Sequence, residues 1–123
     1  MDIGLALKTP GGGVPGVSGP APLTPLPARV SLFDWGGMKL VALPGEIFAA
    51  TALELREALP GPLMLAGFCE DNPGYIPPRD EYVHGGYEID EAHRFYGLPA
   101  TFAPGAAEAL RDAAIGLAAG RAN

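Results

Sequence analysis

The hydrophobic positions in the first half of the chain follow a strand pattern before they follow a helix pattern. Two apolar runs, at about 29–34 and 38–43, flank the sequence Trp35-Gly36-Gly37. A glycine pair between two apolar runs is typical of a tight hairpin turn, because glycine adopts positive φ angles without steric cost. The pattern therefore predicts a β-hairpin, and Pro44-Gly45 would end its second strand.

Residues 46–59 carry the clearest helical pattern, and they are followed by an apolar run at 63–68. Four apolar side chains recur at helical spacing and would form one buried face: Phe48, Ala52, Leu55 and Leu59. The run LMLAGF at 63–68 is typical of a central strand covered on both faces. Strand, helix and strand in this order predict a βαβ-like unit with a hairpin at its edge.

The pattern after residue 69 predicts loops and helices. We expect a loop over 70–78, because Asn72-Pro73-Gly74 favours a turn and Pro77-Pro78 prevents an early helix. Short helices are expected at about 79–86 and 89–96, and a terminal helix at 104–119. The sequence therefore predicts an α+β (α/β-like) fold in which two or three helices pack on a small sheet.

Proline and glycine dominate residues 8–27, which carry a single charge. Proline removes amide donors and glycine raises the entropic cost of ordering, so we expect no regular element there. The composition divides the chain into a flexible arm over 1–27 and a domain over 28–123. An extended arm held against a partner is the alternative interpretation.

The net charge of −6 and the pI near 4.7 narrow the range of partners. Nucleic-acid phosphates and anionic membranes both require a basic surface. No stretch approaches 18 uninterrupted apolar residues, and the first ten residues lack the basic and apolar regions of a signal peptide. We therefore expect no nucleic-acid partner, no transmembrane segment and a cytoplasmic location.

Side chains that can bind or ligate concentrate between Gly74 and Tyr96, which contain all four tyrosines and both histidines. The nine-residue spacing of His84 and His93 matches no common zinc signature, so surface positions are predicted for both. The one cysteine, Cys69, excludes an internal disulfide and is interpreted as a buried structural thiol.

Two oxygen-bearing side chains stand out by position. Glu46 would lie in the first turn of a helix, where the helix dipole favours an ionised carboxylate. Tyr75 would lie in a loop beyond the carboxyl end of an apolar strand, where α/β proteins often bind ligands. On position and composition alone, a glutamate that only starts a helix and a tyrosine that only anchors a loop are the favoured interpretations.

Two segments together resemble the neutral/alkaline non-lysosomal ceramidase family. LPGEIFAATALELREAL (43–59) is similar to the family's segment in which Pro-Gly-Glu precedes a helix ending in Leu-Arg-Glu-Ala. GYIPPRDEYVHGGYE (74–88) is similar to the tyrosine-containing segment that follows it in the family, and the order and spacing agree. The resemblance implies that residues 28–123 are the carboxyl-terminal portion of a ceramidase-like α/β catalytic domain.

Members of this family are zinc amidohydrolases that cleave the N-acyl bond of ceramide. By motif, the resemblance places their glutamate and tyrosine zinc ligands on Glu46 and Tyr75. Their two histidine ligands lie far upstream of the tyrosine, whereas His84 and His93 follow Tyr75. The resemblance therefore implies that the half supplying the imidazoles is a separate chain or a lost part of the gene. It also implies that the isolated chain binds Zn²⁺ weakly and is inactive on lipid amides.

Two other hypotheses stay open at this stage. The chain could be a non-catalytic binding or assembly module that forms a homo-oligomer, or a structural domain unrelated to the family. Shared ligation of one ion requires the carboxylate of Glu46 and the phenol oxygen of Tyr75 to lie within about 3–5 Å of each other.

Overall fold

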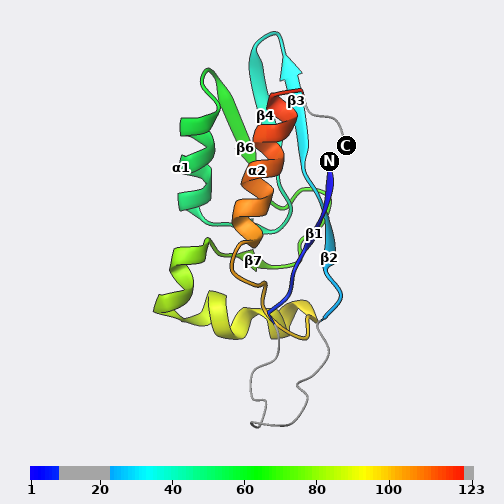
Figure 1. The fold of residues 1–123 in the computed structure, drawn as a ribbon, viewed down its shortest axis with the longest axis vertical. Coiled ribbons are helices and arrows are strands. Elements are labelled where there is room, and N and C mark those ends of the chain that lie inside the picture. Colours follow the sequence, from blue (N-terminus) through cyan, green and yellow to red (C-terminus); the bar gives the residue numbers. More distant parts are fainter. Residues whose placement is uncertain (9–22, 121–123) are drawn as a thin grey trace.

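The computed structural model describes residues 1–8 and 23–120, which form an α+β fold (Figure 1). The strands are β1 (Asp2–Leu5), β2 (Leu26–Arg29), β3 (Ser31–Trp35), β4 (Met38–Ala42), β5 (Glu46–Ile47), β6 (Leu63–Ala66) and β7 (Tyr75–Ile76). The helices are α1 (Ala49–Ala58) and α2 (Ala106–Ala118), with shorter helical turns at η1 (Arg79–His84), η2 (Tyr87–Glu91) and η3 (Ala92–Tyr96). This composition confirms the predicted fold class.

The predicted hairpin is formed by β3 and β4. The two strands pair antiparallel with Trp35 opposite Met38, and the turn between them is Gly36-Gly37. Both glycines have positive φ angles, 62° and 97°, as a two-residue hairpin turn of this kind requires. The glycine pair was therefore a correct signal for the turn.

Strand β6 joins this sheet parallel to β4, after a crossover through α1, so that the strand order is β3-β4-β6. The βαβ-like unit is confirmed, but the prediction that 63–68 is a central strand was wrong. β4 is central and β6 is an edge strand, with the side chain of Met64 53% exposed. An apolar run of this length does not by itself distinguish a central strand from an edge strand.

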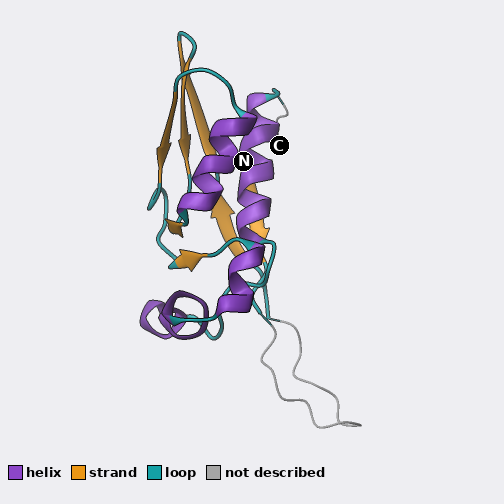
Figure 2. Cartoon of the chain, turned by 90° about the vertical axis from the view of Figure 1, so that its left-hand side faces the viewer, coloured by secondary structure: helices purple, strands orange, loops and turns teal. Residues whose placement is uncertain are grey.

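The helices α1 and α2 lie on one side of the three-stranded sheet (Figure 2). The core forms between them and the sheet, and its fully buried side chains include Val41, Leu55 and Leu110. The terminal helix is confirmed, with bounds of 106–118 in place of 104–119.

The other face of the same sheet carries apolar side chains that remain accessible to solvent. Phe33, Leu40 and Met64 are register partners across the three strands, and Trp35 lies two residues beyond Phe33. Phe33 is 47% exposed and Trp35 is 58% exposed. The sheet is thus packed on one face and open on the other.

The expected flexible arm over 1–27 requires a correction at both ends. β1 pairs antiparallel with β2, and Gly4 lies opposite Pro27 in this two-stranded sheet. Proline is tolerated here because a strand at a sheet edge can leave one amide position unpaired. Residues 9–22, which form most of the predicted arm, lie outside the described residues.

The helix predicted from residue 46 begins three residues later, at Ala49. Glu46 and Ile47 form β5, and the predicted loop over 70–78 contains β7, which pairs with β5 in parallel. Phe48 is extended, with φ −71° and ψ 148°, and separates strand from helix. The inner face of the helical segment consists of Thr51, Leu55 and Leu59, while Phe48 and Ala52 are only partly buried.

Candidate functional site

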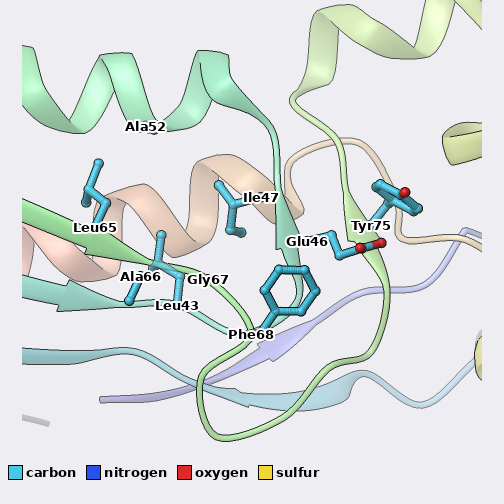
Figure 3. A pocket seen from close by; sticks show the side chains of 9 residues that line it. All are labelled: Leu43, Glu46, Ile47, Ala52, Leu65, Ala66, Gly67, Phe68 and Tyr75. Atoms are coloured by element: carbon cyan, nitrogen blue, oxygen red, sulfur yellow. The ribbon is translucent and has the colours of Figure 1, made fainter.

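The pairing of β5 with β7 brings the two predicted site residues together. Glu46 and Tyr75 are register partners in the parallel pair, so their side chains leave the two strands on the same side. Figure 3 shows the carboxylate of Glu46 beside the phenol of Tyr75. The structure therefore places both oxygens in one location, while the expectation that Glu46 lies in the first turn of a helix was wrong.

Close backbone contact holds the two strands in this arrangement. The Glu46 amide donates to the Gly74 carbonyl at 2.8 Å, and the Gly45 amide donates to the Asp71 carbonyl at 3.1 Å. Gly45 has a φ of 72°, and a Cβ at this position would lie 2.6 Å from the Gly74 carbonyl oxygen. Only glycine meets both the conformational and the steric requirement at residue 45.

The Glu46 carboxylate raises the pKa values of two tyrosines. Its negative charge is the main cause of the raised pKa of Tyr75, followed by burial and a hydrogen bond to Glu46. The hydroxyl of Tyr96 donates to Glu46 Oε2 at 3.0 Å, and this hydrogen bond is the main cause of the raised pKa of Tyr96. The site therefore contains one carboxylate faced by two protonated phenols.

Tyr96 is a site residue that the sequence did not indicate. It lies 50 residues from Glu46 and belongs to η3, and no local pattern predicts that this segment reaches Glu46. Its position at the end of the tyrosine-rich stretch was the one available signal, and that signal did not separate it from the other tyrosines.

A pocket of about 390 Å³ opens beside the oxygens (Figure 3). Its lining is mainly apolar, and Glu46 and Tyr75 supply its polar side chains. The lining residues are Leu43, Glu46, Ile47, Ala52, Leu65, Ala66, Gly67, Phe68 and Tyr75. A pocket of this composition suits a ligand with an apolar chain and a polar group at one end.

A series of aromatic contacts fixes the ring of Tyr75. The ring meets Phe48 on one side and Tyr87 on the other, both edge to face, with centroid distances of 6.3 and 6.1 Å. Tyr87 in turn contacts Phe95. Such contacts favour one orientation of the Tyr75 phenol and keep it directed at Glu46.

The two histidines differ from each other in burial. His84 is exposed, as predicted, but the surface position predicted for His93 was wrong, because this residue is partly buried. Its Nδ1 is shielded from solvent and has no hydrogen-bond partner among the described residues. Cys69 is also only partly buried, and its thiol donates to the Gly67 carbonyl at 3.3 Å, so the interpretation as a buried thiol was too strong.

Within residues 1–8 and 23–120, histidine, cysteine, aspartate and glutamate form no group of three or more that could hold a metal ion. In the same described ranges, no helix is long and apolar enough to cross a membrane.

Comparison with known proteins shows that the chain resembles a solved structure in fold. No family model and no curated protein matches the sequence. Among solved structures, the fold is similar to a segment of a ceramidase. That protein is the neutral ceramidase from Pseudomonas aeruginosa, with a TM-score of 0.59 and 20% sequence identity over 77% of this chain. The match covers 15% of the ceramidase chain, so this protein corresponds in fold to a small part of it.

Proposed function

We propose that residues 28–123 are part of a ceramidase-like catalytic domain and contribute Glu46 and Tyr75 as oxygen ligands of a zinc ion in an amide-hydrolysing site. The observation that carries the proposal is the β5–β7 register, which pairs the two residues that the motif resemblance selects. The fold likeness to a neutral ceramidase supports the same relationship at a coarser level.

The donor chemistry at the site fits zinc. Carboxylate oxygen is a common zinc ligand, and a protein site normally provides three or four ligands in total. Glu46 and Tyr75 account for two, so the imidazoles would come from outside residues 28–123, in a second chain or in a further part of a longer protein. When bound, zinc supplies Lewis-acid polarisation of a carbonyl and a water of lowered pKa.

The chain's own residues would provide charge and substrate binding. In the absence of a cation, the charge of Glu46 raises the pKa of Tyr75 and keeps this phenol protonated. A cation held between the two oxygens would act in the opposite direction and favour the phenolate. The apolar walls of the pocket, which include Leu43, Ile47 and Leu65, suit the hydrocarbon chain of a ceramide or a related lipid amide.

The test supplies the missing ligands as free imidazole. Co²⁺, a spectroscopic substitute for Zn²⁺, is titrated into the chain with and without imidazole, and visible absorption reports tetrahedral binding. We expect weak binding alone and stronger binding with imidazole. Glu46→Gln and Tyr75→Phe should each abolish the gain, whereas Glu57→Gln, at an exposed position on α1, should preserve it.

In a separate assay, the isolated chain loaded with Zn²⁺ should not hydrolyse N-acyl amides. Equal Co²⁺ affinity in the Glu46→Gln and Glu57→Gln variants would contradict the ligand assignment. Stoichiometric zinc and amide hydrolysis by the chain alone would contradict the need for outside imidazoles.

A second candidate function, assembly of copies of this chain, is favoured by the open face of the three-stranded sheet. Phe33, Trp35 and Met64 present an uncharged apolar surface there, and a second copy would offer an identical one. Their accessible area is roughly 300 Å², well below the ~800 Å² per partner of a standard interface. Self-association through this face should therefore be weak and concentration-dependent.

Sedimentation over a range of protein concentrations tests this assembly. Trp35→Ser should shift the equilibrium toward monomer, whereas Leu53→Ser, which removes an equally exposed side chain on α1, should leave it unchanged. Identical behaviour of both variants, or a monomer at all concentrations, would exclude the sheet face as the interface.

A further inference from the structure

We propose that Tyr96 is a positioning residue that fixes the Glu46 carboxylate in the orientation needed to bind a metal ion. The inference rests on the proposed role of Glu46 as a ligand, and it assigns a function to a residue outside both motifs. The hydroxyl of Tyr96 donates to Glu46 Oε2 at 3.0 Å, across a sequence separation of 50 residues.

The ring of Tyr96 packs against the backbone of Gly74, the residue directly before β7. Its carbons lie 2.9 to 3.2 Å from the position that a Cβ on Gly74 would occupy. The ring can pack this closely only because residue 74 is glycine, and Gly74 directly precedes Tyr75. Tyr96 therefore contacts the side chain of Glu46 on β5 and the backbone of Gly74, directly before β7.

The end of η3 also restricts Tyr96. Gly97 adopts a left-handed conformation with a φ of 70°, and its amide donates to the His93 carbonyl. This turn ends the helical segment immediately after Tyr96, so the chain leaves the site while the phenol stays directed toward Glu46. The ring has little freedom to move away from the carboxylate.

The hydrogen bond has a direct consequence for ligation. A carboxylate has several acceptor positions, and a donor on one oxygen limits its rotation while leaving others for a metal ion. Loss of such a partner typically costs about 10- to 100-fold in metal affinity.

The test uses Tyr96→Phe, which removes the hydroxyl but keeps the ring against Gly74. The matched control is Tyr82→Phe, which removes a hydroxyl that donates to the Phe102 carbonyl at 2.7 Å. In Co²⁺ titrations with imidazole, Tyr96→Phe should weaken binding by about 10-fold or more, and Tyr82→Phe should leave it unchanged.

A second measurement needs no metal and no Tyr96 variant. Ring-labelled tyrosine NMR at neutral pH compares the Cζ resonances of the wild-type chain with those of Glu46→Gln. We expect the Cζ resonance of Tyr96 to shift in the variant while that of Tyr82 stays unchanged, because the hydroxyl of Tyr96 donates to Glu46 Oε2 at 3.0 Å. This readout depends on the contact itself and decides the question if Tyr96→Phe does not fold.

The outcomes separate this inference from the proposed function. If Glu46→Gln binds Co²⁺ as well as the wild type does, the proposed function fails. If Glu46→Gln loses affinity while Tyr96→Phe retains it, the positioning role alone is overturned. An unchanged Cζ resonance of Tyr96 in Glu46→Gln would also overturn it.

Discussion

At the scale of single residues, the tyrosines take different roles according to what their hydroxyls contact. Tyr75 and Tyr96 face the Glu46 carboxylate, which raises the pKa of each. Tyr82 instead donates to the Phe102 carbonyl at 2.7 Å, and burial is the main cause that raises its pKa to about 12. Tyr82 thus belongs to the packing of the domain, and Tyr75 and Tyr96 belong to the site.

Tyr82 should make the stability of the fold depend on alkaline pH. Its pKa in the folded chain is about 12, above the ordinary value of 10.0, so the unfolded chain ionises first as pH rises. Its stabilising contribution is complete below pH 10 and is lost as pH rises through the folded pKa. Between pH 8 and pH 12, the free energy of unfolding of the wild type should therefore fall by about 1–2 kcal/mol more than that of Tyr82→Phe.

Urea unfolding at several pH values between 8 and 12 measures this difference. At neutral pH, Tyr82→Phe should lower the free energy of unfolding by about 1 kcal/mol through loss of the hydrogen bond. Because the other tyrosines also ionise at high pH, the comparison with the variant isolates the contribution of Tyr82. Parallel pH profiles for the two proteins would show that burial of Tyr82 has no such effect.

At the scale of elements, the site depends on two strands of two residues each. β5 and β7 are too short to show a periodic pattern, and they lie where proline, glycine and a helical period favoured other assignments. The hairpin and α2 could be predicted because Gly36-Gly37 and the apolar stripe containing Leu110 and Ala113 are local signals. The β5–β7 pair is not local, because it joins segments separated by α1 and β6.

Gly45 provides a direct test of the β5–β7 contact. Gly45→Ala should lower the free energy of unfolding by about 1–3 kcal/mol more than Gly36→Ala. The two glycines have similar positive φ angles of 72° and 62°, but a Cβ on Gly36 meets nothing within 4 Å. The difference therefore measures the clash with the Gly74 carbonyl, and urea unfolding of both variants provides it. Equal losses would mean that β5 and β7 do not approach as described.

At the scale of the whole molecule, the fold class and two of the three polar residues of the candidate site could be predicted from the sequence. The motifs around Glu46 and Tyr75 selected both residues, although the helix-dipole argument for Glu46 was wrong because residue 46 lies in a strand. Tyr96 could not be selected, because its hydrogen bond to Glu46 joins residues 50 positions apart and exists only in the folded chain. The open face of the three-stranded sheet could not be predicted either, because it depends on which side of the sheet the helices cover.

The central claim is that Glu46 and Tyr75 bind the same metal ion. The most direct test is NMR of the chain with labelled glutamate carboxyl and tyrosine ring carbons, during a Zn²⁺ titration in the presence of imidazole. We predict that the Glu46 carboxyl and Tyr75 phenol resonances shift together with zinc, while Tyr82 stays unchanged. Glu46 and Tyr75 resonances that stay unmoved throughout the titration would contradict the shared site.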